Sequence, residues 1–196
     1  EVYKEYQKKL KNGNSIDFDD LLILPIKLFR NYPRVLEEYQ DRYKYILIDE
    51  YQDTNEAQYT FSKLLSAKYR NIFVVGDNDQ AIYAFRGANY KNILNFEKDY
   101  PEAKTILLEE NYRSTKTILN AANSVIKNNH ERKDKNLWSN NATGNKIKYK
   151  EVANEKEEAS FVGTEIKRLL SEGINEEDIA VLYRTNAQSR VIEEEM

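Results

Sequence analysis

YILIDEYQDTN, residues 45–55, joins a short apolar run to two adjacent carboxylates, and the class of fold follows from this junction. The apolar run at 45–48, which is rich in β-branched and aromatic residues, predicts a buried strand. In an open α/β sheet, ligand chemistry gathers just beyond the carboxyl ends of the strands, which is where Asp49 and Glu50 fall. One carboxylate can hold Mg²⁺ while the other orients a water, and nucleotide hydrolysis needs both roles beside the terminal phosphate.

The rest of the first half alternates apolar runs with helical patterns. Further strands are predicted at residues 72–75 and 105–108, and helices at residues 18–30, 34–43, 55–67 and 90–100. Pro25 is expected to kink the first helix, and Pro33 to lie in the first turn of the second. Thr54 or Asn55 is expected to cap the third helix. This alternation predicts an α/β fold with a parallel sheet covered on both faces.

The pattern restarts after residue 108, which predicts one lobe at residues 1–108 and another at residues 109–196. The second lobe is expected to contain helices at residues 114–128 and 155–170 and strands at residues 146–152 and 179–183. An Asn-rich loop is expected over residues 128–145. Arg132, Lys133 and Lys135 in this loop could attract phosphates, but a solvated loop is the plainer interpretation.

Composition narrows the class of protein. Lys+Arg 30 against Asp+Glu 33 gives a net charge of −3, so any nucleic-acid surface must be local. The absence of cysteine excludes disulfides and thiolate metal sites and suits a reducing cytoplasm, where we expect the protein to reside. The longest apolar run, residues 21–26, is far too short to span a membrane.

Three further stretches accompany the acidic pair. They are GDNDQAIYAFRGA at residues 76–88, LEENYRST at residues 108–115 and IAVLYRTNAQSR at residues 179–190. Together with DEYQDTN and with DFDDLL at residues 17–22, they resemble in order and spacing the superfamily-one DNA helicases of the PcrA/UvrD/Rep type. One such motif would be weak, whereas several long matches in order, spanning residues 17–195, are specific.

The resemblance implies two incomplete RecA-like motor lobes, each a parallel sheet flanked by helices. It implies an ATP-dependent helicase and translocase that moves 3′ to 5′ on single-stranded DNA and acts at duplex junctions, with ATP and Mg²⁺ as cofactors. Two alternatives stay open. One is a subunit of a helicase–nuclease complex, and the other is a natural truncated module that binds DNA or a partner without catalysis.

The resemblance also implies a nucleotide site. Asp49 would bind Mg²⁺, and Glu50, beside the metal, would orient the attacking water as general base. Gln80 would contact the γ-phosphate and the water, which suits an amide because it both donates and accepts. Tyr112 would pack on the base and sugar, and Arg113 would reach the γ-phosphate as an arginine finger. The plainer interpretations are a solvated strand-end pair for Asp49 and Glu50, a surface amide for Gln80 and an ordinary surface ion pair for Arg113.

A DNA site is implied at a second set of residues. Tyr83, Phe85 and Arg86 would stack on and hold bases of single-stranded DNA, although core packing would also explain the two aromatic rings. The family often has Trp where this chain has Phe85, and the smaller ring is expected to stack more weakly. Arg184 and Asn186 would contact the DNA backbone, although Asn186 could simply cap the following helix.

One part of the nucleotide machinery is missing from these residues. None of the six glycines is followed by Lys, so the phosphate-cradling G-x-x-x-x-G-K-[ST] loop is absent. We therefore expect an internal fragment of a helicase that is inactive alone. The strand leading into that loop would also be missing, so exposed strand edges are expected to cause self-association, strand swapping or a local rearrangement that covers the gap.

Overall fold

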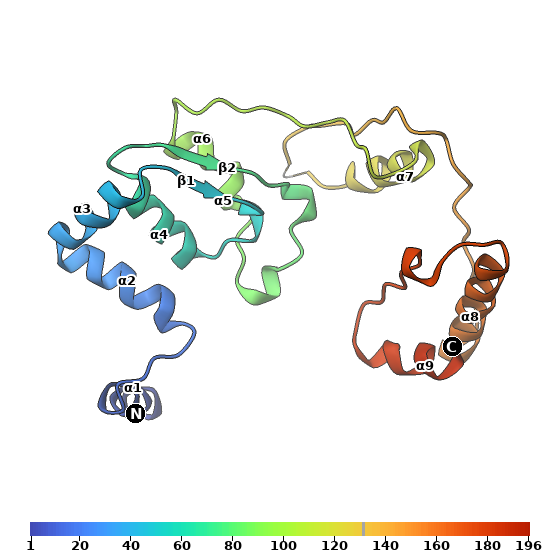
Figure 1. Cartoon of the computed structure of the whole chain (residues 1–196), viewed down its shortest axis with the longest axis horizontal. Helices are drawn as coiled ribbons and strands as arrows, with labels where there is room; N and C mark the ends of the chain where they lie inside the picture. Colours follow the sequence, from blue (N-terminus) through green and yellow to red (C-terminus); the bar gives the residue numbers. More distant parts are fainter. Residues whose placement is uncertain (131) are drawn as a thin grey trace. The chain divides into compact units, whose positions relative to one another are not determined.

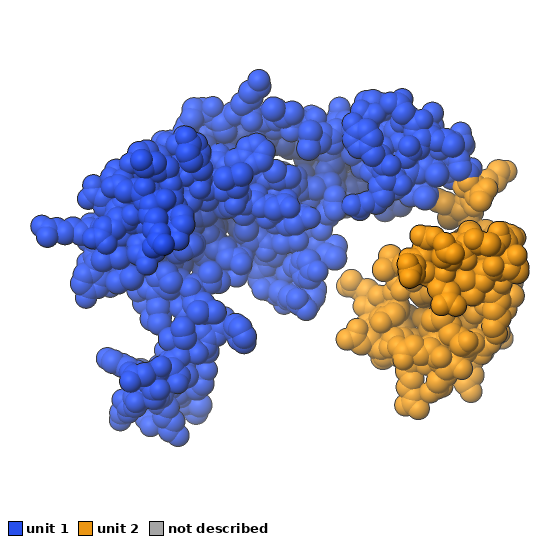
Figure 2. All heavy atoms as spheres, viewed as in Figure 1, with its two compact units in different colours: residues 1–144 blue, residues 145–196 orange. Residues whose placement is uncertain are grey.

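The computed structural model describes residues 1–130 and 132–196. The chain forms two compact units, residues 1–144 and residues 145–196 (Figures 1 and 2). In the first unit the helices and strands are α1 (Val2–Asn12), α2 (Asp20–Asn31), α3 (Pro33–Arg42), β1 (Ile46–Ile48), α4 (Glu56–Ser66), β2 (Ile72–Val74), α5 (Lys91–Leu94), α6 (Phe96–Asp99) and α7 (Lys116–Ile126). Short 3₁₀ turns η1 (Tyr51–Asp53), η2 (Asn78–Gln80) and η3 (Ala84–Arg86) follow the strands.

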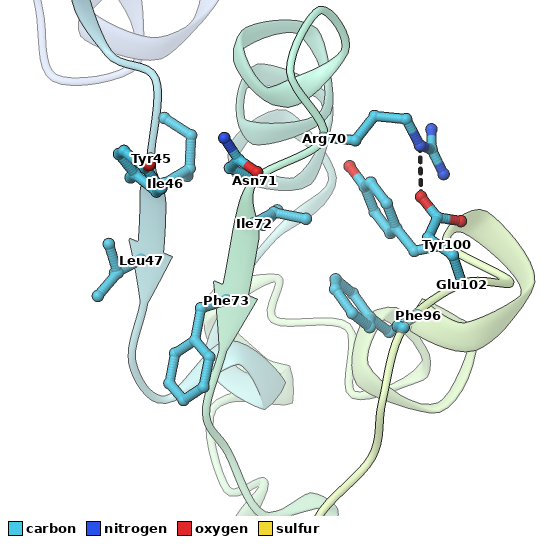
Figure 3. Close-up of a pocket in the computed structure, with 11 residues that line it drawn as sticks. Tyr45, Ile46, Leu47, Arg70, Asn71, Ile72, Phe73, Phe96, Tyr100 and Glu102 are labelled. Carbon is cyan, nitrogen blue, oxygen red and sulfur yellow. Dashed lines mark hydrogen bonds and ion pairs between the residues drawn. The ribbon is translucent and has the colours of Figure 1, made fainter.

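The sheet consists of β1 and β2, which pair in parallel with Ile46 opposite Ile72. This pairing confirms the predicted α/β fold around the acidic pair. Ile72 points toward Phe96 and Tyr100 on one side of the sheet (Figure 3). On the other side, Leu47 is 73% exposed and Phe73 is 61% exposed. The prediction of helices on both faces is therefore wrong for this part of the chain.

Three predicted strands are not regular strands. Residues 105–108, 146–152 and 179–183 carry no strand assignment, and exposed apolar side chains mark all three segments, namely Ile106, Leu108, Ile147, Tyr149 and Leu182. A strand is stable only when a neighbour completes its hydrogen-bond ladder. Within the described ranges the one contact of this kind near residue 108 is an isolated bridge between Glu110 and Trp138.

Most of the predicted helices in the first unit are present in the structure. α2 runs through Pro25, α3 begins at Pro33, and α4 begins after Asn55, as the sequence indicates. The helix expected at residues 90–100 is instead split at Asn95 into α5 and α6. Asn has low helix propensity because its side chain competes for backbone hydrogen bonds, which favours a break there.

Two aromatic clusters hold the first unit together. Phe29 of α2 stacks on Phe61 of α4 with ring centroids 5.8 Å apart. Beyond β1, Tyr51 meets Phe96 edge-on at 5.8 Å, and Phe96 stacks on Tyr100 at 4.8 Å. Burial raises the pKa of the Tyr51 hydroxyl to about 12. The second cluster anchors the turn after the acidic pair and so fixes where that pair lies.

The second unit contains α8 (Glu155–Ser171), η4 (Glu176–Asp178) and α9 (Ala187–Glu195). Asn154 caps α8, since its side-chain oxygen accepts from the backbone N–H groups of Lys156 and Glu157. α8 and α9 bury Ala159 and Ile192. Across residues 1–130 and 132–196, no helix has the length and apolarity that crossing a membrane requires.

Replacing Asn55 by alanine should destabilise the first unit by about 1 kcal/mol. Asn55 Oδ1 accepts from the Gln58 backbone N–H at 2.9 Å, and Gln58 Oε1 accepts in return from the Asn55 N–H at 2.9 Å. Urea unfolding followed by circular dichroism measures the loss. Asn186→Ala is the matched control, because Asn186 occupies the N-cap position of α9 without a side-chain hydrogen bond. Equal losses in the two variants would contradict the prediction.

Candidate functional site

The acidic pair lies in the turn that leaves β1. Glu50 has φ 49° and ψ 44°, a left-handed conformation that is uncommon outside glycine. Asp49 Oδ1 accepts from the Glu50 backbone N–H at 2.9 Å, and both carboxylates are exposed. They line a hollow of about 420 Å³ together with Asp53 and with Phe61 of α4. The pair therefore faces space that a ligand could enter.

The donor set around this hollow fits a cation that brings most of its own ligands. Asp53, which also lines the hollow, has one buried carboxylate oxygen, Oδ1, without a hydrogen-bond partner. In the described part of the chain, no cluster of three or more His, Cys, Asp or Glu residues could hold a metal alone. Mg²⁺ is usually held by one or two carboxylates plus phosphate and water, which matches Asp49 and Glu50.

Gln52 links the acidic pair to the next strand. Its side chain is only 1% exposed; its Nε2 donates to Glu50 Oε2 at 2.8 Å, and its Oε1 accepts from the Asp77 backbone N–H at 2.9 Å. Gly76 permits this approach, because a Cβ there would lie 2.4 Å from Gln52 Oε1. Gln52 was not among the predicted site residues, because its partner Asp77 lies 25 residues away in the sequence.

Gln80 joins the same network through Asp77. The Gln80 Nε2 donates to Asp77 Oδ2 at 2.9 Å, while Asp77 Oδ1 accepts from the Asp79 backbone N–H at 2.9 Å. Burial would raise the pKa of the Asp77 carboxyl, but hydrogen bonds from Lys135 and Gln80 outweigh it and hold the pKa below its usual range. A continuous path therefore runs from Glu50 through Gln52 and Asp77 to Gln80.

Arg132 and Lys135 are part of this region, contrary to the solvated loop expected for them. The Arg132 Nη2 lies 2.9 Å from Asp79 Oδ2, and both side chains are 8% exposed. Lys135 pairs with Asp77, with side chains 14% and 20% exposed. The interpretation was wrong because paired carboxylates from a distant turn desolvate these cations. Lys133, by contrast, is 36% exposed and pairs with Glu97.

Tyr83, Phe85 and Arg86 form an exposed aromatic cluster just beyond Gln80. The Tyr83 and Phe85 ring centroids are 6.2 Å apart, and the Arg86 guanidinium lies 5.4 Å from each centroid. Phe85 is 79% exposed and Tyr83 is 39% exposed, which rules out core packing as the explanation. Exposed rings flanked by a cation suit base stacking.

Tyr112 and Arg113 are both exposed. The Tyr112 hydroxyl donates to Glu110 Oε2 at 2.8 Å, and this bond raises the pKa of the hydroxyl. Asn111 Oδ1 accepts from the Arg113 backbone N–H at 3.0 Å and so fixes the turn that carries both residues. In the described ranges no hydrogen bond or ion pair joins Arg113 to Asp49, Glu50 or Gln80, so their roles at one nucleotide stay predictions.

The second unit holds the other two predicted DNA contacts. Arg184 and Asn186 are exposed, and Gln188 Oε1 accepts from the Arg184 backbone N–H at 3.0 Å. The same oxygen accepts from the Thr185 N–H at 2.9 Å, so Gln188 shapes the turn before α9. The capping alternative for Asn186 finds no support, because its side chain makes no cap hydrogen bond.

Comparison with known proteins accounts for both halves of the chain. Residues 1–101 match the UvrD/REP helicase N-terminal domain, and residues 106–196 match the UvrD-like helicase C-terminal domain. The chain belongs to the UvrD/REP helicase family. Among similar proteins, the ATP-dependent DNA helicase PcrA of Staphylococcus aureus is 60% identical and that of Staphylococcus epidermidis is 58% identical, each over 193 residues. The alignment covers 98% of this chain but only 26% of either relative.

The UvrD/REP family matches assign the buried ion pairs to different domains. Asp77 and Asp79 lie in the match to the N-terminal domain, while Arg132 and Lys135 lie in the match to the C-terminal domain. The two matches meet between residues 101 and 106, whereas the compact units divide after residue 144. The predicted lobe boundary after residue 108 stays a prediction. The pairs Arg132–Asp79 and Lys135–Asp77 thus connect the two UvrD/REP sequence regions inside one compact unit.

Proposed function

We propose that this chain is part of an ATP-dependent DNA helicase that translocates 3′ to 5′ on single-stranded DNA and acts at duplex junctions. The observation that carries the proposal is the hydrogen-bond path from Glu50 to Gln80, which ends three residues before an exposed aromatic cluster. A nucleotide-sensing group and a base-stacking surface on one short segment suit a motor that couples the two. The relatives' name, ATP-dependent DNA helicase, supports the same function.

The nucleotide half of the proposal assigns a role to each polar group. When bound, ATP with Mg²⁺ supplies the phosphoanhydride bond and the cation that neutralises the developing charge. Asp49 offers a carboxylate oxygen to the cation, and Glu50 accepts a proton from the attacking water. Gln80 contacts the γ-phosphate through its exposed amide. Tyr112 packs on the base, and Arg113 approaches the γ-phosphate once its turn has moved toward the site.

Gln52 gives the proposed general base a fixed orientation. Its amide donates to one oxygen of the Glu50 carboxylate, so the other oxygen remains to accept a proton. The same amide accepts from the backbone of the turn that carries Gln80. A shift of Gln80 on phosphate contact would therefore be felt at Glu50, and the aromatic cluster follows Gln80 directly in the chain.

The DNA half of the proposal rests on Tyr83, Phe85 and Arg86, with Arg184 and Asn186 as backbone contacts. Stacking on exposed rings tolerates any base, which suits movement along DNA of any sequence. We place the protein in the cytoplasm, because a chain without cysteine suits a reducing compartment. The bare sheet face around Leu47 and Phe73 supports self-association of this chain as well.

Replacing Phe85 by alanine should weaken the binding of this chain to single-stranded DNA by about tenfold, the loss of one stacked base. Fluorescence anisotropy with a labelled oligothymidine at low salt measures the affinity. Binding is the suitable readout because residues 1–196 lack the phosphate-cradling loop.

Two further variants make the DNA measurement decisive. Phe85→Trp should bind at least as tightly as the original chain, since a larger ring stacks better. Phe18→Ala is the control, because Phe18 is also an exposed phenylalanine, at 89%, on a different segment. If Phe85→Ala and Phe18→Ala bind DNA equally well, the aromatic cluster is not the stacking surface.

A further inference from the structure

Two cations from one segment are buried against two carboxylates of the Gln80 turn. The Arg132 guanidinium contacts both oxygens of Asp79, Nε to Oδ1 at 3.2 Å and Nη2 to Oδ2 at 2.9 Å. Lys135 pairs with Asp77 and also lies 3.4 Å from Asp79 Oδ2. The Arg132 Nη2 donates in addition to the Lys135 backbone oxygen at 3.2 Å, which fixes one cation relative to the other.

Burial makes these pairs interdependent. A carboxylate that is mostly removed from water is costly unless a cation and hydrogen bonds compensate it, and removing one partner leaves the other uncompensated. Asp77 and Asp79 are separated by a single residue, so without Arg132 and Lys135 their charges would repel each other across the turn. The shape of η2 therefore depends on cations supplied from more than 50 residues away, at a separation of 53 for Arg132 and Asp79.

The same contacts extend to the amide of Gln80. Asp77 uses Oδ1 for Lys135 and for the Asp79 backbone N–H, and Oδ2 for the Gln80 Nε2. The carboxylate thus holds the nitrogen end of the Gln80 amide, so the oxygen end is the one left to turn outward. A carboxylate that rotated freely would hold neither the turn nor the amide.

We propose that Arg132 and Lys135 are positioning residues for Gln80: by clamping Asp79 and Asp77, they fix the turn and the orientation of its amide. The proposal deepens the function above, because it rests on Gln80 being the group that meets the terminal phosphate. Asp77 and Asp79 lie in the region matching the N-terminal domain, and Arg132 and Lys135 in the region matching the C-terminal domain. A displacement of the segment at 132–135 therefore reorients Gln80 directly.

Nuclear magnetic resonance on this chain, without nucleotide or DNA, tests the clamp. Hydrogen exchange of the Asp79 backbone amide reports its bond to Asp77 Oδ1, and the heteronuclear Overhauser effect of the Gln80 side-chain amide reports its freedom. Lys135→Met should speed the exchange of the Asp79 amide by about tenfold or more, the loss of a charge-assisted hydrogen-bond network. It should also turn the Gln80 side-chain amide from ordered to mobile.

Three comparisons separate positioning from general damage. Lys135→Arg should keep the exchange of the Asp79 amide slow, because arginine is also a cation and has a similar reach. Lys133→Met should change nothing at Asp79 or Gln80, since Lys133 pairs with Glu97 instead. Asp79→Asn, which keeps the shape and removes the charge, should loosen the turn from the other side while β1 amides stay protected. If Lys135→Met fails to fold, Asp79→Asn alone tests whether the ion pairs position Gln80.

The outcome that overturns the proposal is an unchanged Asp79 amide and an ordered Gln80 amide in Lys135→Met and in Asp79→Asn. Equal loosening in Lys133→Met would overturn it too, since a general effect of lost charge would then suffice. Because no nucleotide is present, these results stand whether or not the chain comes from a helicase. A loss of DNA binding in Phe85→Ala, in turn, does not depend on the clamp.

Discussion

Replacing Gln52 by leucine is expected to destabilise the chain by about 1–3 kcal/mol, because it leaves the partly buried Asp77 backbone N–H without an acceptor. The Asp77 backbone N–H loses its acceptor, and Glu50 loses the donor that holds its carboxylate. Leucine fills a similar volume, so the loss reflects hydrogen bonding rather than an empty cavity. The hydrogen-bond path between the acidic pair and Gln80 would be cut at its centre.

Urea unfolding measures this loss, and exchange of the Asp77 backbone amide locates it. Gln52→Glu is the informative companion, because a carboxylate still accepts from Asp77 but cannot donate and repels Glu50. It should therefore destabilise the chain too, while Asp77 stays protected from exchange. Gln58→Leu, which removes an exposed amide from the α4 capping box, should cost less than half as much. A Gln52→Leu variant as stable as Gln58→Leu would disprove the bridge.

Replacing Gly76 by alanine is expected to cost about 1–3 kcal/mol through overpacking. The added methyl would lie 2.4 Å from Gln52 Oε1, 2.9 Å from Ile93 Cδ1 and 3.0 Å from the Tyr51 backbone nitrogen. The Tyr51 contact is with backbone in a packed turn, so it cannot be relieved by a rotamer change alone. The Gln52 side chain would have to leave Asp77, and the two strand ends would separate.

The matched control is Gly163→Ala, in the interior of α8. A methyl there would meet only Glu195, with its flexible Cγ at 3.3 Å, and alanine is a better helix former than glycine. The midpoint temperature of thermal unfolding should therefore fall for Gly76→Ala and stay the same or rise for Gly163→Ala. Combining Gly76→Ala with Gln52→Leu should cost less than the sum, since both break one contact. Strict additivity would contradict a shared mechanism.

Local signals predicted the parts of the fold that depend on neighbours in sequence. The apolar run before Asp49 became β1, and the Asn55 cap began α4 as expected. The segment at 105–108 has the same kind of pattern but forms no ladder, because strand formation depends on a partner that periodicity cannot reveal. The pattern predicted which residues prefer extended backbone, and pairing decided which became strands.

The residues of the candidate site also divide into those that local sequence predicts and those that depend on distant contacts. Asp49 and Glu50 were predicted because they directly follow an apolar run, and Gln80 because its stretch of sequence resembles a helicase motif; both signals lie in contiguous residues. Gln52 contacts Asp77 across 25 residues, so no local pattern indicates it. Arg132 and Lys135 were misjudged for a related reason. A cation in an Asn-rich stretch resembles a solvated one until the distant carboxylates that bury it are known.

The left-handed backbone at Glu50 lowers the stability of the folded chain at the position that carries the proposed general base. A residue with a Cβ is disfavoured there by about 1 kcal/mol or more relative to glycine. Laboratory evolution that selects only for heat resistance would consequently favour Gly or Asn at position 50. Either replacement removes the carboxylate that is proposed to accept a proton. A variant with a higher melting temperature than its ancestor would then lack the group proposed to activate water for ATP hydrolysis.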